Sequence, residues 1–152
     1  MPQLELADDV YAHLLSIRTG MRRFERWSEQ QARAAGLTKA QHQLLLAIRG
    51  HHDPRGPTVG EVADYLLLRH HSAVGLIDRA VVARLISRKR DEGDRRVVRL
   101  RLSAKGSKRI EELSALHVEE LKRLRSHFPS AWEGLAPIQR VHGFAGSPTA
   151  SS

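Results

Sequence analysis

Apolar residues in the first third of the chain recur at intervals of three and four positions, as they do along one face of a helix. Asp8 or Asp9 caps the predicted start of this helix through its carboxylate, and Gly36 ends it in the left-handed conformation. The stripe suits a partner helix and the chain's own core equally well. Its positions are Val10, Leu14, Ile17, Met21 and Phe24.

Two capping boxes predict where the next helices begin. In each box a threonine hydroxyl accepts the N–H three residues on, and a glutamine or glutamate side chain reaches back. Thr38 and Gln41 open a helix that ends near Gly50, and Thr58 and Glu61 open a shorter one. Only a few residues separate the Thr58 helix from another apolar-periodic segment, and two short helices with so brief a link predict a helix-turn-helix. The apolar positions of its second helix are Ala73, Leu76, Ile77 and Ala80.

After Arg84 the apolar period changes from helical to two, which predicts a strand. Val98, Leu100 and Leu102 face one side of it, with Val97, Arg99 and Arg101 on the other. The segment from Leu85 to Lys89 pairs with this strand across a polar turn that contains Gly93. Helix, helix and hairpin is the order of a winged helix, so the fold class is mainly α with a small β-hairpin wing.

Ser103 caps a last long helix that runs to about His127 and is broken by Pro129. A shorter helical piece follows, and from Gly143 the small, polar tail is expected to be disordered. The apolar positions of the shorter piece are Trp132, Leu135 and Ile138.

Charge narrows the class of partner. The 152 residues include 25 Lys and Arg against 17 Asp and Glu, a formal charge of +8. The stretch from Arg69 to Arg109 contains thirteen of the basic residues and only four of the acidic ones. Such a stretch favours a nucleic acid partner, and a solvated basic face is the alternative.

The absence of cysteine excludes disulfides, thiolate nucleophiles and sensors based on cysteine oxidation. No apolar run of 18 residues and no secretory leader are found, so we expect a cytoplasmic protein without a membrane partner. No Gly-rich phosphate loop, His-Glu-x-x-His or Gly-x-Ser-x-Gly motif is present. We therefore expect no enzyme activity, no catalytic residues and no cofactor.

The middle of the chain resembles the MarR family of transcription regulators, from about Leu37 to Gly106. The resemblance rests on the segment 66–79 (LLLRHHSAVGLIDR), on Leu85-Ile86-Ser87-Arg88, on Asp94-Arg95-Arg96 and on Leu100-Arg101-Leu102-Ser103. It implies a homodimer formed by the outer helices, which reads double-stranded DNA. The implied units are a dimerisation helix (1–36), a winged-helix lobe (37–103), C-terminal dimerisation helices (104–142) and a disordered tail (143–152).

The resemblance places one helix in the major groove and the wing in the flanking minor groove. Asp94 is expected to orient the guanidinium of Arg96 by a charge-assisted hydrogen bond, with a simple turn former as the alternative. Thr58 is expected to offer its helix N-terminus to a phosphate. The expected DNA-binding residues of the helix are His70, His71, Ser72, Val74, Gly75 and Arg79. Those of the wing are Arg88, Lys89, Arg90, Asp94, Arg95 and Arg96. Of these, the four cations other than Arg96 are expected to meet phosphates, and a merely solvated side chain is the alternative for some of them.

The sequence departs from the family pattern at three places. Arg84 stands after the recognition helix where glycine is usual, and a left-handed arginine costs on the order of 1 kcal/mol. Ala80 occupies a position where leucine is usual. His70 and His71 occupy sites that often hold a better capping residue.

The resemblance also implies a repressor of a pseudo-palindromic operator that is released by a small-molecule effector. Ordinary core is the alternative for each expected ligand-binding residue: Ile17, Met21, His42 and Leu46. Nine histidines keep open a metal-responsive regulator of the same fold. No His-x-x-x-His pair supports one, and no metal ligand is predicted. A sequence-indifferent architectural DNA-binding protein is a further alternative.

Overall fold

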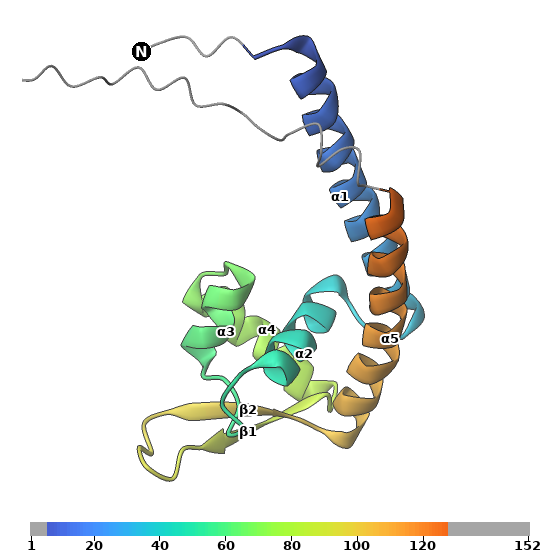
Figure 1. Ribbon diagram of the computed structural model, residues 1–152. Helices are drawn as coiled ribbons and strands as arrows, with labels where there is room; N and C mark the ends of the chain where they lie inside the picture. Colours follow the sequence, from blue (N-terminus) through green and yellow to red (C-terminus); the bar gives the residue numbers. More distant parts are fainter. Residues whose placement is uncertain (1–5, 128–152) are drawn as a thin grey trace, which may run out of the picture.

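The computed structural model describes residues 6–127, so the predicted piece at 132–138 and the predicted disordered tail lie outside the described residues. An arm and a lobe make up this part of the chain. Figure 1 shows α1 beside α5 in the arm, and the other helices with the hairpin in the lobe. The mainly helical fold with a hairpin wing is confirmed. The elements are α1 (Asp8–Ala34), α2 (Lys39–Gly50), α3 (Val59–Leu66), α4 (His70–Val82), β1 (Ile86–Arg90), β2 (Val98–Leu102) and α5 (Ala104–His127).

Both predicted capping boxes are present. The backbone N–H of Gln41 donates to Thr38 Oγ1 at 3.1 Å, and Glu61 N–H donates to Thr58 Oγ1 at 3.2 Å. Each partner side chain accepts from the threonine N–H in return. Ser103 also caps α5 as predicted, because its Oγ accepts from Gly106 N–H at 3.0 Å.

The predicted cap of α1 is wrong. Ala7 is the N-cap and makes no side-chain hydrogen bond, while Asp8 and Asp9 lie inside the first turn. Their carboxylates there are placed to interact favourably with the positive end of the helix dipole.

Three helices end in one motif, with a left-handed residue followed by a buried or half-buried leucine. Gly36, Leu67 and Arg84 have φ values of 78°, 54° and 60°. After each, a leucine N–H donates to an alanine carbonyl five residues earlier: Leu37 to Ala32, Leu68 to Ala63 and Leu85 to Ala80. These are Schellman motifs. The family pattern, with glycine usual at this position, had drawn attention to Arg84, which is left-handed in the structure, whereas Leu67 was not singled out.

The hairpin is antiparallel, and its register pairs Ile86 with Leu102 and Arg90 with Val98. The first strand was predicted to begin at Leu85, which is wrong by one residue. Leu85 belongs to the Schellman motif that follows α4, because its N–H donates to the carbonyl of Ala80 rather than to the partner strand. Its carbonyl accepts from Ser103 N–H at 3.0 Å, which connects the ends of α4 and the hairpin.

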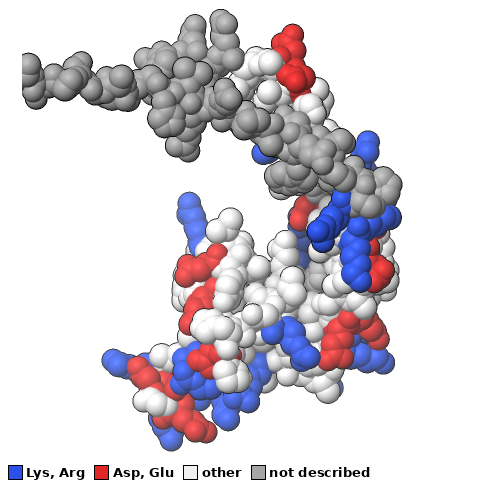
Figure 2. Space-filling view, viewed as in Figure 1, with Lys and Arg blue, Asp and Glu red and all other residues white. Residues whose placement is uncertain are grey.

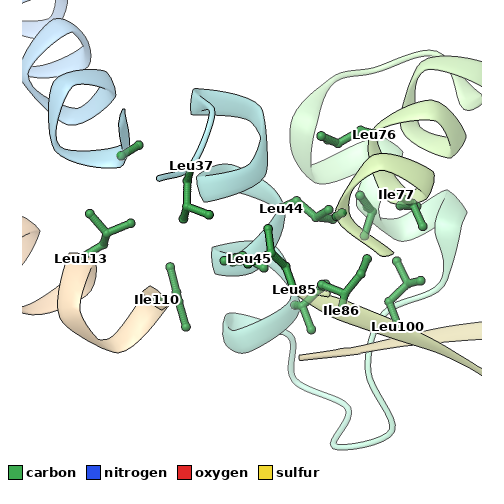
Figure 3. Close-up of a cluster of buried hydrophobic side chains, with 14 residues drawn as sticks. Leu37, Leu44, Leu45, Leu76, Ile77, Leu85, Ile86, Leu100, Ile110 and Leu113 are labelled. Atoms are coloured by element: carbon green, nitrogen blue, oxygen red, sulfur yellow. The ribbon is translucent and has the colours of Figure 1, made fainter. Parts of the chain in front are cut away.

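A hydrophobic core surrounds α2. Figure 3 shows α2 between α5 on one side and α4 on the other. Leu44 and Leu45 of α2 are fully buried, as are Leu85 and Leu100. Gly106 at the start of α5 has no room for a side chain, since a Cβ there would lie 2.1 Å from Leu85 O. The core therefore joins arm and lobe through close backbone packing.

The predicted stripe of α1 is only partly covered in the single chain. Ile17 is buried, whereas Met21 is 60% exposed and Leu14 is also exposed. None of the helices within residues 6–127 has the length and apolar character needed to cross a membrane.

The left-handed Leu67 makes a test of backbone strain. Its side chain is 91% exposed, so Leu67→Gly removes little buried surface while it relieves the steric cost of φ 54°. We expect the free energy of unfolding, measured by urea denaturation, to rise by about 1 kcal/mol.

Val82→Gly is the matched control, because Val82 is also exposed but lies in regular α4. This change is expected to lower the free energy of unfolding by a few tenths of a kcal/mol. Equal destabilisation by both variants would contradict the assignment of strain to Leu67.

Candidate nucleic-acid interface

Helix α4 presents one buried and one open face. Its buried residues are Ala73, Leu76, Ile77 and Ala80, which the period had predicted. Because these residues pack into the core, the opposite face of α4 points outward. The exposed residues of that face include four of the expected DNA-binding positions: His70, His71, Ser72 and Arg79; Val74 and Gly75 are half-buried.

Gly75 leaves room for the guanidinium of Arg79. A Cβ on Gly75 would lie 3.3 Å from Arg79 Nη1, which is a close contact. The arginine side chain thus folds back along α4 over the glycine. Because Gly75 has no side chain, it leaves space on the surface of α4, and the cationic guanidinium of Arg79 lies beside that space.

The tip of the wing carries the predicted ion pair. Arg96 Nε donates to Asp94 Oδ1 at 3.2 Å and Nη2 donates to Oδ2 at 3.3 Å. Asp94 Oδ1 also accepts from Arg96 N–H at 3.1 Å. The hydrogen bonds from the Arg96 side chain hold the pKa of Asp94 below its usual range. Arg96 itself remains 90% exposed, so an oriented cation projects from the tip.

Three other basic residues of the wing, Arg88, Lys89 and Arg90, have partners within the lobe. Arg88 pairs with Asp78 of α4, and Arg90 Nη1 donates to the carbonyl of Arg95 at 2.9 Å. Lys89 Nζ lies 3.9 Å from Glu92 Oε1. In Figure 2 red and blue atoms accordingly alternate over the hairpin. The wing is a patterned surface rather than a uniformly positive one.

Thr58 lies at the N-terminus of α3 and is half-buried. Its hydroxyl serves the capping box, and its backbone forms a bridge with Arg99 of β2. The start of α3 is thereby attached to the wing.

The sequence interpretation missed a cluster of charges at the base of the wing. Asp91 is buried beside Arg99, and Arg55 of the α2–α3 loop lies against both Asp53 and Asp91. Hydrogen bonds from Arg55 hold the pKa of Asp53 far below its usual range, and those from Arg99 lower the pKa of Asp91. No local signal reveals this cluster, because residues 53–55 and 91–99 meet only in the fold.

The four expected ligand-binding residues have different surroundings. Ile17 and His42 are buried, while Met21 and Leu46 are exposed. His42 contacts His117 of α5, with ring centroids 4.7 Å apart, and His117 also contacts Trp27 of α1.

Burial of His42 in this aromatic junction lowers its pKa, proximity to His117 lowers it further, and Glu25 opposes both effects. Glu25 and Trp27 of α1 therefore bear on the junction, as do Phe24 and Ser28, which both contact His117. Ile17 lies about 12 Å from Glu25 along the helix axis. The four expected ligand-binding residues thus combine His42 with Ile17, and Ile17 lies in a different part of α1 from the residues at the His42 junction.

Among the described residues, no group of three or more histidine, aspartate or glutamate side chains is placed to hold a metal ion. Two of the described histidines bond to neighbouring groups instead: His117 Nε2 lies 2.7 Å from Ser28 Oγ, and His51 Nδ1 lies 2.8 Å from the Tyr65 hydroxyl.

Two linked helices, the outward face of the second and a hairpin with an oriented arginine define a winged helix-turn-helix. Residues 35–97 of the chain match the model of the MarR family. The resemblance to this family is thus confirmed for the winged-helix lobe. No curated protein matches the chain.

Solved structures of MarR family proteins have the same fold. A MarR family protein from Bacillus stearothermophilus is 26% identical, with a TM-score of 0.67 over 79% of this chain and 82% of that one. MarR family transcription regulator SP03579 is 20% identical, with a TM-score of 0.69 over 83% and 82%. The S. aureus MepR–DNA complex is 20% identical, with a TM-score of 0.62 over 81% and 85%.

The buried His42 predicts a loss of stability in acid. The folded protein holds this imidazole neutral below its ordinary pKa, so the unfolded chain binds a proton first as the pH falls. The free energy of unfolding should decline below about pH 6.5, with a slope of at most about 1.4 kcal/mol per pH unit from this group. Urea denaturation of wild type and His42→Gln between about pH 7.5 and 5.5 measures the effect.

His42→Gln should flatten that decline, whereas His52→Gln, which changes an imidazole in the loop after α2, should leave it unaltered. A wild-type slope retained in His42→Gln would show that other groups cause the acid sensitivity.

Proposed function

We propose that this protein is a transcription regulator that binds double-stranded DNA as a homodimer and represses genes through a pseudo-palindromic operator. In this proposal the exposed face of α4 reads bases in the major groove, and Arg96 enters the adjoining minor groove. The structure of S. aureus MepR, which shares this fold, is that of a complex with DNA, and it supports this use of the lobe.

One observation carries the proposal, namely that an open helix face and an oriented arginine belong to one lobe with a shared core. Small residues such as Ser72 and Gly75 allow a helix backbone to approach base edges, where the major groove presents distinguishable donors and acceptors. An arginine suits the narrow, electronegative minor groove of A·T-rich DNA. The short turn and shared core hold both features in a constant relation.

The exposed apolar residues of the arm support a homodimer. A second copy of the arm would remove them from water, and burial of apolar surface contributes about 25 cal/mol per Å². Two lobes related by a two-fold axis would then address half-sites about one helical turn apart. The exposed apolar side chains of α1 and α5 are Tyr11, Leu14, Leu15, Met21, Leu116, Val118 and Leu121.

We place a small-molecule effector, as the release signal, near His42 at the junction of α1, α2 and α5. The aromatic rings there lie where arm and lobe meet. A ligand that binds one arrangement of arm and lobe better than another would shift the spacing of the two reading helices. Titration with aromatic acids, followed by measurement of DNA release, tests this component separately.

Selection of bound duplexes from a random pool, followed by footprinting, tests the proposed function. We expect two inverted half-sites with their centres about 10 bp apart, protected by two protein chains. Arg96→Ala should reduce affinity for the selected duplex by about 1–3 kcal/mol and relax the preference at positions flanking the half-sites.

Binding of every duplex with equal affinity, falling uniformly as salt rises, would instead identify a sequence-indifferent architectural protein. In that case Arg96→Ala would weaken all duplexes alike.

Gly75→Ala separates stability from recognition. Alanine in a helix is about 1 kcal/mol more favourable than glycine, so thermal unfolding should occur at a higher temperature. The added Cβ meets the Arg79 guanidinium, and we expect affinity for the selected duplex to fall while stability rises.

Gly50→Ala, at the end of α2 where nothing lies within 4 Å of an added Cβ, is the control and should leave DNA affinity unchanged. A Gly75→Ala variant that binds DNA like wild type would remove this face of α4 from the interface.

A further inference from the structure

The two faces of the hairpin have different chemistry. Ile86 and Leu100 point into the core, whereas Lys89 and Arg99 form a pair across the other face. Arg99 is nevertheless largely covered, with 15% of its side chain exposed. The cover comes from the loop between α2 and α3, which lies along β2.

Asp91 sits where β1 turns into the tip, and both of its carboxylate oxygens are engaged within the lobe. Its side chain is 6% exposed. One oxygen, Oδ1, accepts from the backbone N–H groups of Gly93 at 2.7 Å and Asp94 at 3.3 Å. The other, Oδ2, accepts from Arg99 Nε at 2.7 Å and Arg55 Nη1 at 3.3 Å. One carboxylate therefore joins the tip, the second strand and the loop.

The loop is also attached to β2 through its backbone. Leu100 N–H donates to Pro57 O at 2.9 Å, and Arg99 Nη1 donates to Gly56 O at 3.1 Å. Gly56 has φ 91°, and a Cβ on it would lie 1.9 Å from Leu100 O. This segment leads directly into Thr58, the cap of α3. The wing is thus attached to the first helix of the helix-turn-helix.

A continuous series of contacts runs from this attachment to Arg96. Arg99 holds the Asp91 carboxylate, Asp91 holds the backbone of Asp94, and Asp94 holds the guanidinium of Arg96. Asp91 N–H also donates to Val97 O at 2.9 Å, which closes the base of the tip. Every link is a hydrogen bond within the lobe.

We propose that Asp91 and Arg99 are positioning residues that hold Arg96 of the wing in a defined relation to α4 for DNA recognition. The inference rests on the proposed function and adds a determinant of it. Neither residue needs to touch DNA. A buried carboxylate paired with a guanidinium in low dielectric surroundings is directional, and loss of one partner leaves the other charge uncompensated.

Charge alone predicts the opposite result for Asp91, which allows a sharp test. Asp91→Asn removes a negative charge from a surface that meets a polyanion, so a purely electrostatic role predicts tighter binding. The positioning role predicts weaker binding, by about tenfold for the selected duplex, as expected for a broken charged hydrogen bond. Glu92→Gln is the matched control, because it removes the same charge from the adjacent residue, whose side chain is 90% exposed.

Fluorescence anisotropy with the duplex selected by wild type should show Asp91→Asn weaker and Glu92→Gln equal or tighter. Equal tightening by both variants would overturn the proposal. Arg99→Lys is the second variant, which keeps the charge but loses the Nε–H bond; it should weaken binding in the same direction even where Asp91→Asn fails to fold. Unchanged affinity in a folded Arg99→Lys protein would also overturn it.

A double-mutant cycle with Arg96→Ala distinguishes positioning from general stability. Since Asp91 acts through Arg96, Asp91→Asn should cause little further loss in the Arg96→Ala background. Additive losses would show that Asp91 acts elsewhere. Failure of the proposed function has a different signature, because wild type would then select no sequence at all.

Discussion

The burial of α2 in the middle of the molecule is the constraint on which the other elements depend. Leu44 and Leu45 are inaccessible to water, and α2 stands between α5 of the arm and α4 of the lobe (Figure 3). Protein interiors are close-packed, so displacement of one neighbour of α2 alters its packing against the other. The lobe and the arm therefore share one core rather than meeting at a flexible joint. This arrangement gives a physical basis for coupling between the arm and the exposed face of α4.

Local chemistry in the sequence predicted most of the fold. The capping boxes at Thr38 and Thr58 depend on residues three positions apart, and the change of period after Arg84 depends on side-chain alternation. The errors arose where a competing local contact was possible. Asp8 and Asp9 were both suitable N-cap residues by their type, yet α1 begins at Asp8, earlier than either cap would allow, and includes both. Leu85 looked like a strand residue but completes the end of α4.

In the candidate site, too, the features that depend on nearby residues were predicted from the sequence, and those that depend on distant contacts were not. The open face of α4 was predicted from the helical spacing of its apolar residues, and the Asp94–Arg96 ion pair was predicted from the two-residue spacing of its partners. Asp91 and Arg99 were not singled out, because their importance comes from the loop between α2 and α3, far earlier in the chain. Nothing in the residues around Asp91 distinguishes it from Glu92, although one is buried and the other exposed. Such non-local burial of charge is visible only in the folded chain.

The attachment of residues 56–58 to β2 also restricts how this lobe can vary in length. An insertion between Gly56 and Thr58 would shift the backbone pairing with Leu100 and displace the first turn of α3. An insertion before Asp53, where the chain leaves α2, would leave that pairing intact. Length variation among proteins built on this lobe should therefore gather on the α2 side of the loop, and deletions beyond it should be the ones that abolish folding.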